Sequence, residues 1–320
     1  MIDGQELDLD AASMFSVVGM TVTMIDSAAG MRAMVSSSPE QWKDAARRLW
    51  EPMAGMYFFI PGGPDLAAVH SQNFGFGPSV AADKILGAVD ALERADAWGR
   101  VERALETGLR ELNAADPTVA MPDLTVLLVL GDPTNKHFMD EIRGLSAFGG
   151  ISGYIAITIW PTDEVLARLE GIALHELHHN VRYSPGGVVW NPQTVTVGEH
   201  VVAEGLADLF AADLVGEQGF THFVSDQTRT SDEVLRRVTE GLDVTGMQDF
   251  AAWVLGDPSA CLFGATPVGL PTGAGYAAGA RFVSAYREAT GQSPARAVAT
   301  PASEILAVAL PQLGLTMPAR

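Results

Sequence analysis

The stretch Gly171–Asn180, which reads Gly-Ile-Ala-Leu-His-Glu-Leu-His-His-Asn, most strongly limits what this chain can fold into. His175 and His179 are four residues apart, and Glu176 directly follows the first of them. On an α-helix, residues at i and i+4 lie on one face, so the two imidazoles can point at the same atom. The spacing therefore predicts a helix that presents two imidazoles together, with a glutamate one step round from them.

This is the H-E-x-x-H pattern, in which zinc hydrolases place two metal ligands and a general base on one helical turn. The pattern is short enough to arise by chance, so a helix with hydrogen-bonded structural histidines is the alternative. A pair formed by His175 and His178 could also reach one metal ion, but it would leave Glu176 without its usual geometry. We therefore expect His175 and His179 to be the ligands.

A second helix, expected to begin near Val197, brings a third candidate ligand. His200, Glu204 and Asp208 stand at i, i+4 and i+8 among apolar residues. Buried polar side chains need partners, and a metal site would provide them. Catalytic zinc takes three protein ligands and leaves a fourth position for water. Glu204 is the expected third ligand for Zn²⁺, and Asp208 is expected to orient a ligand histidine through its second N–H.

H-E-x-x-H followed by E-x-x-x-D resembles the gluzincin metallopeptidases, whose third zinc ligand is that glutamate. More narrowly, H-E-L-H-H, the E-G-L-A-D run at 204–208 and the later G-Y-x-x-G at 275–279 resemble bacterial predicted Zn-dependent proteases of the YjaZ type. The resemblance covers roughly the second half of the chain. It implies a zincin-like core, zinc bound by His175, His179 and Glu204, and Glu176 as general base and proton carrier.

The oxyanion that forms during amide hydrolysis needs a further hydrogen-bond donor. Tyr276, His200 and Tyr183 are candidates. We expect Tyr276 first, because the resemblance includes it, and His200 second.

The predicted fold class is α+β. It comprises a zincin-like metallopeptidase core, made of a small mixed sheet and the H-E-x-x-H helix, and a mostly helical C-terminal part. Residues 1–120 are expected to form a mostly helical region packed on a catalytic region, 121–320, and the two can form one continuous domain.

Strands are predicted at 15–25, 124–130 and 154–160. Helices are predicted from Ser38, over 79–113 with a break near Asp96, over 163–180, from Val197, from Ser231, over 246–255, from Gly275, and from Ser293 to about 310. Surface loops are predicted at 66–78, where His70 is expected to be solvated, and at the Gly/Pro-rich 256–273.

Charge and composition exclude several partners. Lys and Arg total 20 against 39 Asp and Glu, a net charge of −19 that repels nucleic acid and anionic lipid. The N-terminus is acidic, unlike a signal peptide, and no uncharged apolar run is long enough to span a bilayer. The single cysteine, Cys261, is expected to be a small buried residue in a reducing compartment. A cytoplasmic protein is predicted.

The expected function is zinc-dependent hydrolysis of peptide bonds in a peptide or protein substrate. An extended substrate backbone is expected to pair with a sheet edge beside the metal helix. Two alternatives stay open. One is a zincin-fold protein that binds peptides or a regulator without cleaving them, and the other is a zinc hydrolase of a non-peptide amide or ester.

Overall fold

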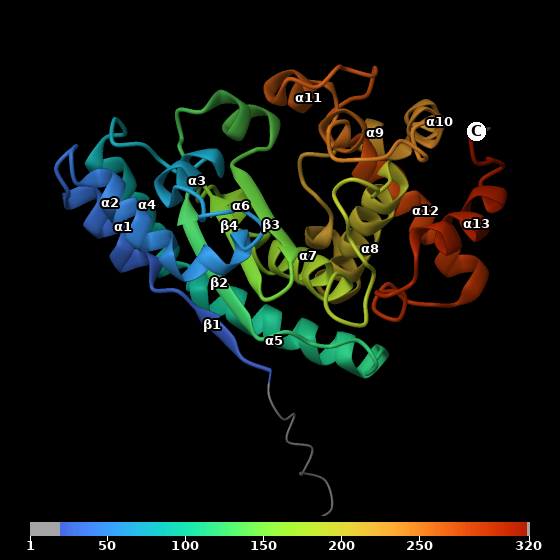
Figure 1. Ribbon diagram of the computed structural model, residues 1–320, viewed down its shortest axis with the longest axis horizontal. Helices are drawn as coiled ribbons and strands as arrows, with labels where there is room; N and C mark the ends of the chain where they lie inside the picture. Colours follow the sequence, from blue (N-terminus) through green and yellow to red (C-terminus); the bar gives the residue numbers. More distant parts are fainter. Residues whose placement is uncertain (1–19, 319–320) are drawn as a thin grey trace, which may run out of the picture.

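The computed structural model describes residues 20–318. Its sheet has the strand order β1-β2-β4-β3. The helices of residues 27–94 lie to the left of the sheet in Figure 1 and those after residue 196 to the right, whereas the helix Ala97–Ala115 packs along the helix Leu169–Arg182. The strands are β1 (Val22–Met24), β2 (Leu124–Leu130), β3 (Leu145–Ile151) and β4 (Tyr154–Ile159). β2 runs parallel to β1 and β4, whereas β3 is antiparallel to β4 and forms an edge. The α+β class with a small mixed sheet is confirmed, and the zincin-like core stays a prediction.

β2 is one of the two inner strands of the sheet, and it coincides with the predicted strand 124–130. Apart from the partly exposed Thr125, its side chains are buried. Both neighbours of β2 run parallel to it, so its faces must be covered by other elements, and a continuous apolar run is the sequence that fits.

The first predicted strand is longer than the one that forms. β1 is confined to Val22–Met24, and residues 15–19 of the predicted strand lie outside the described residues.

β3 was not predicted, because the glycine-rich segment that starts at Gly149 was interpreted as the opening of the strand at 154–160. Gly149 instead lies within β3, at a point where a side chain would collide with the backbone carbonyl of Glu176. Its lack of a Cβ lets this edge strand lie directly against the helix that carries the histidines. Here glycine marks a close backbone approach.

The N-terminal half is mainly helical. Its helices are α1 (Ser27–Ser36), α2 (Trp42–Trp50), the 3₁₀ helix η1 (Glu51–Tyr57), α3 (Leu66–Gln72), α4 (Ala82–Arg94) and α5 (Ala97–Ala115). The predicted break is confirmed at Asp96, whose φ of 51° is left-handed. The predicted start at Ser38 is wrong: the carbonyl of Ser38 closes a turn, and α2 begins at Trp42 without a side-chain cap.

The predicted loop 66–78 is also wrong, since it contains α3, and its His70 is fully buried. The indole N–H of Trp50 donates to Nδ1 of His70 at 3.0 Å. Because an indole can only donate, Nδ1 is unprotonated, and Nε2–H donates to the carbonyl of Phe76 at 3.0 Å. These partners are distant in the sequence, so local composition did not reveal them.

The second half begins with a short π-helical segment, η2 (His137–Glu141), between β2 and β3. After β4 come α6 (Asp163–Leu166), α7 (Leu169–Arg182), α8 (Val197–Val215), η3 (Gly216–Gly219), α9 (Asp226–Thr230), α10 (Asp232–Glu240), η4 (Ala251–Leu255), α11 (Asp257–Phe263), α12 (Ala274–Thr290) and α13 (Ala302–Gln312). No helix among residues 20–318 has the length and apolarity to cross a bilayer.

Four predictions for this half need correction. The helix predicted over 163–180 is two helices, α6 and α7, and the predicted loop 256–273 contains α11. The last helix begins at Ala302, because the segment after Ser293 forms turns. Cys261 is exposed. Short apolar stretches rich in Gly and Pro were taken for loops, although tertiary packing makes them helical.

Two apolar cores meet at α8. One includes the sheet, the N-terminal helices, α7 and the end of α8 at Phe210 and Ala211. The other combines the first part of α8, from Val197 to Leu206, with α10, α12 and α13. The division into 1–120 and 121–320 stays a prediction.

Burial lowers the pKa of His70 to about 4, against 6.5 for an ordinary histidine. The unfolded chain therefore binds more protons than the folded one between these values, and the free energy of unfolding should fall as pH drops from 6.5 towards 4. His70 contributes at most about 1.4 kcal/mol per pH unit. Denaturant titrations at several pH values measure this.

His70→Gln retains an acceptor and a donor but cannot titrate, so its stability should fall less steeply over the same range. His222, whose pKa burial also lowers to about 4, still contributes in that variant. Equal slopes for the two proteins would contradict the assignment of acid sensitivity to His70.

Candidate metal centre

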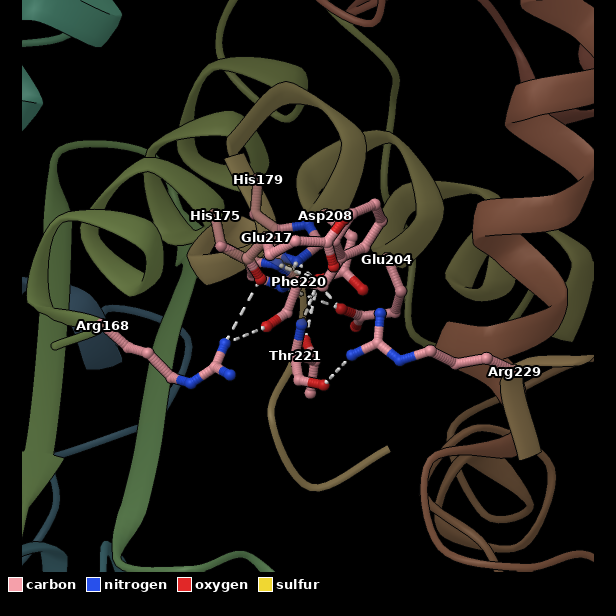
Figure 2. Close-up of polar contacts among 9 residues, drawn as sticks. All are labelled: Arg168, His175, His179, Glu204, Asp208, Glu217, Phe220, Thr221 and Arg229. Carbon is pink, nitrogen blue, oxygen red and sulfur yellow. Dashed lines mark hydrogen bonds and ion pairs between the residues drawn. The ribbon is translucent and has the colours of Figure 1, made fainter. Parts of the chain in front are cut away.

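α7 and α8 pack against each other and bring four predicted site residues together (Figure 2). Oε2 of Glu204 lies 3.0 Å from Nε2 of His175 and 3.2 Å from Nε2 of His179. The two Nε2 atoms are 3.1 Å apart. On the far side of the ring, Nδ1 of His175 lies 3.0 Å from Oδ1 of Asp208. All four side chains are buried.

This arrangement requires a positive charge at its centre. Asp208 can only accept a hydrogen bond from Nδ1 of His175, so in the neutral ring Nε2 presents a lone pair to the carboxylate of Glu204. Burial opposes protonation of His175, but Asp208 and Glu204 outweigh it and raise its pKa well above the ordinary value. The paired histidines likewise hold the pKa of Glu204 well below its usual range despite burial. A proton or a metal ion among the three groups meets this demand.

His175, His179 and Glu204 form a group that can hold a metal ion, because one ligand atom from each lies within 4.8 Å of the others. Two imidazole nitrogens and a carboxylate oxygen are a donor set that catalytic zinc uses. With zinc–ligand distances near 2.0–2.1 Å, two ligands of a tetrahedral ion are roughly 3.3 Å apart. The 3.0 to 3.2 Å between the atoms here fits that size.

Glu176 lines the cleft beside this group, with its side chain almost fully buried. Burial raises the pKa of its carboxyl, His175 and His179 oppose the rise, and the charge of Glu204 adds to it. Its backbone lies against Gly149 of β3, so the helix is fixed to the sheet edge at the glutamate itself.

Asp208 is held by a loop that the sequence analysis did not single out. Its Oδ1 accepts from the backbone N–H of Thr221 at 3.2 Å and from the Thr221 hydroxyl at 2.7 Å. Two arginines approach this loop from opposite sides (Figure 2). Arg168 donates to the carbonyl of Phe220 at 3.0 Å, and Arg229 donates to that of Thr221 at 2.7 Å. The loop thereby fixes the carboxylate that orients His175.

α12 packs on α8 at backbone contact. A side chain at Gly205 would collide with Gly279, and one at Gly279 would collide with the carbonyl of Val201. This crossing, one residue from Glu204, brings Tyr276 of α12 beside His175. The Tyr276 and His175 rings stack with centroids 6.0 Å apart.

The three oxyanion candidates differ in their partners. Tyr276 is partly buried in the cleft, and burial, with the charge of Glu204, raises the pKa of its hydroxyl well above the ordinary value. Nε2 of His200 is buried without a hydrogen-bond partner among the described residues, and burial lowers its pKa. The Tyr183 hydroxyl donates to Glu199 at 3.2 Å.

His178 lies apart from the group. Its Nε2 lies 3.2 Å from the carbonyl of Pro294, and its ring contacts Phe210 in the core. Of the two predicted pairings, the structure thus brings His175 together with His179 and not with His178.

The metal centre opens into a cleft of about 310 Å³. Edge strand β3 and α7 contribute to its walls, as do the segment 218–223 and α11. The Gly/Pro-rich segment 256–273 therefore borders the cleft, through Ser259, Phe263 and Thr272. Thr272 also donates to Glu141 at 3.1 Å, which ties this segment to η2.

A family model described as "Predicted Zn-dependent protease (DUF2268)" matches residues 98–307. The chain belongs to this family. The uncharacterized protein YjfC of Bacillus subtilis (strain 168) is 36% identical over 163 residues, which are 50% of this chain and 52% of YjfC. The chain thus spans about half the length of this curated relative. No solved structure matches it. The resemblance that we drew from the H-E-L-H-H and E-G-L-A-D motifs is confirmed, and zinc is the metal that the family's description names.

The role of Thr221 in supporting the buried group of His175, His179 and Glu204 can be tested by Thr221→Val. Valine removes the hydroxyl that donates to Asp208 and leaves the backbone N–H. Partners of this kind typically change metal affinity by about 10- to 100-fold, and we expect a loss of about tenfold. Competition against a zinc chelator measures the dissociation constant.

Thr118→Val is the matched control. Thr118 binds Asp116 through its backbone N–H at 3.1 Å and its hydroxyl at 2.6 Å, on an exposed turn far along the chain. The zinc affinity of Thr118→Val should equal that of the parent protein. The same affinity in both variants would remove Thr221 from the support of the metal centre.

Proposed function

We propose that this protein is a zinc metallopeptidase of the gluzincin kind, with a zincin-like core formed by the sheet, α7 and α8. His175, His179 and Glu204 are the ligands, and Glu176 is the general base. The observation that carries the proposal is the convergence of three buried ligand atoms within 3.2 Å, backed by Asp208 and open to a cleft.

Bound zinc polarises the scissile carbonyl and lowers the pKa of the attacking water. Glu176 accepts the proton of that water as it attacks, and then delivers the proton to the leaving amine. A carboxyl whose pKa is raised by burial suits this task, because the proton must be taken up and released again. Asp208 keeps the hydrogen of His175 on Nδ1, so Nε2 stays free to bind metal.

Tyr276 donates its hydroxyl to the developing oxyanion, and His200 is the second candidate donor. The raised pKa of Tyr276 keeps its hydroxyl protonated at neutral pH. Tyr183 is disfavoured, because its hydroxyl is already bound to Glu199.

The free edge of β3 aligns the substrate. The N–H of Trp160 donates to the carbonyl of Gly144 at 2.7 Å, and antiparallel bonds alternate along a strand. Residues 146 and 148 therefore bond to β4. The backbone groups of Ala147 face the other edge, as does the carbonyl of Leu145, whose N–H already donates to the carbonyl of Ile142 at 3.3 Å. An extended peptide can add there as a further strand.

Glu176→Gln should keep its zinc and lose hydrolysis of a peptide library by about 10²- to 10⁴-fold, because glutamine cannot accept the proton. His179→Ala should lose the metal as well. Plasma mass spectrometry gives the zinc content, and cleavage of the library gives the activity. The control is Glu111→Gln, which makes the same change at an exposed position of α5.

Retained peptidase activity in Glu176→Gln would contradict the mechanism. Zinc in the parent protein with no peptide cleaved would favour a peptide-binding or regulatory protein. Hydrolysis of amides or esters alone would favour a non-peptide hydrolase.

Tyr276→Phe should lower kcat about 10²-fold and leave KM and zinc content nearly unchanged, because the hydroxyl acts mainly on the oxyanion. Tyr286→Phe removes a hydroxyl from the same helix away from the cleft and serves as the control. An unchanged kcat in Tyr276→Phe, together with a large loss in His200→Ala, would assign the donor to His200.

A further inference from the structure

The cleft that leads to the metal centre has mainly apolar walls. Its large side chains come from segments that are far apart in the sequence, which the fold gathers around one opening. Seven of these side chains are phenylalanine or tryptophan, and none of the seven lies on α7 or α8: Phe74, Phe148, Trp190, Phe220, Phe223, Phe250 and Phe263.

The same cleft offers little to a charged substrate side chain. Its acidic residues among those described are Glu176 and Glu204, and both belong to the proposed catalytic centre. The guanidinium of Arg168 already donates hydrogen bonds to the backbone carbonyls of Glu217 and Phe220. His222 is buried, and its lowered pKa keeps it neutral at pH 7. A basic side chain placed here would lose its hydration without gaining an opposite charge outside the proposed catalytic centre. An acidic side chain would meet Arg168 alone among the described lining residues, and that guanidinium is already hydrogen-bonded to two carbonyls.

Several apolar side chains at this cleft stay exposed. Phe148 on β3 is 45% exposed, Phe263 on α11 is 59% exposed, and Met247, before η4, is 38% exposed. All three line the cleft, and Leu262, 49% exposed, adjoins Phe263. Eight large hydrophobic residues are exposed among those described, and these four are half of them. Exposed apolar side chains gathered at a cleft indicate a binding surface.

The size and edge of the cleft restrict the form of the ligand. A cavity of about 310 Å³ is at the small end of ligand pockets, so it takes a few side chains and no folded domain. The open edge of β3 bonds to an extended backbone, whose side chains alternate between two faces. Every second side chain of such a peptide then meets the same wall.

We propose that this site selects extended peptide segments that carry a large apolar side chain, aromatic above all, next to the scissile bond, and that Phe148 and Phe263 form part of the surface that receives it. The proposal rests on the proposed peptidase function and adds its substrate class. Proteins expose such segments when they are unfolded or contain unstructured stretches, because folded domains bury these side chains.

The test uses zinc-loaded protein and internally quenched peptides that differ at a single position X within an Ala/Gly/Ser background. X is Phe, Leu, Ala, Lys or Asp, and mass spectrometry locates the cleaved bond. The value of kcat/KM should be about ten- to a hundredfold higher for Phe or Leu than for Ala, Lys or Asp. Cleavage should occur beside X.

Phe148→Ser and Phe263→Ser should each lower the Phe-to-Ala ratio of kcat/KM several-fold, mainly through KM. Both positions are exposed, so the fold should tolerate the change. Phe58→Ser is the matched control: Phe58 is 78% exposed and does not line the cleft, so its ratio should equal that of the parent protein. Binding of a fluorescent Phe peptide to Glu176→Gln, measured by anisotropy, gives a second readout without turnover.

The outcomes separate the two proposals. Cleavage without preference, or with preference for Lys or Asp, overturns the substrate class and leaves the peptidase function intact. Ratios unchanged in both Phe148→Ser and Phe263→Ser overturn the assignment of the receiving surface. Binding of Phe peptides over Ala peptides, with no cleavage of any peptide, supports the apolar surface and overturns the peptidase function.

Discussion

Two histidine nitrogens and a carboxylate oxygen point at one another in the buried interior, and the rest of the site depends on that arrangement. The Nε2 atoms of His175 and His179 and Oε2 of Glu204 repel one another unless a cation lies among them. Asp208 strengthens this need for a cation, because it holds the hydrogen of His175 on Nδ1, on the opposite side of the ring from Glu204. Because the three groups are buried, leaving them without a cation would cost free energy. A proton on His175 or a bound metal ion removes this repulsion, so the packing of α7 against α8 depends on the site holding one of the two.

Glycines allow the close contacts by which the fold holds these elements together. Gly205 and Gly279 put α12 in backbone contact with α8, and Gly149 puts β3 in contact with α7 at Glu176. Gly171, at the start of α7, similarly contacts the carbonyl of Gln218, which precedes the loop that holds Asp208. Each contact involves a residue on α7 or α8 within four positions of a proposed ligand or of the proposed base. A methyl group at any of them would have to move a whole element, not just a side chain.

The sequence was most informative where chemistry depends on helical spacing. The five predicted site residues stand on two regular helices, so the directions of their side chains follow from the helical period. They are His175, Glu176 and His179 on one helix and Glu204 and Asp208 on the other. The sheet edge β3 could not be read, because Gly149 serves a contact with a helix that lies later in the chain. Thr221 stands in an irregular loop, where no period relates it to Asp208. His70 was misjudged for the same reason, since its partners Trp50 and Phe76 meet it only in three dimensions.

α8 belongs to both apolar cores, and the residues that face the metal centre lie along it between its two buried ends. The proposed ligands thus come from α7, in the first core, and from the part of α8 where the second core adjoins it. An ion bound there adds its binding free energy to the contact between the cores. Metal binding would then couple the unfolding of the two cores. They would unfold together when the ion is present, and more independently when it is removed.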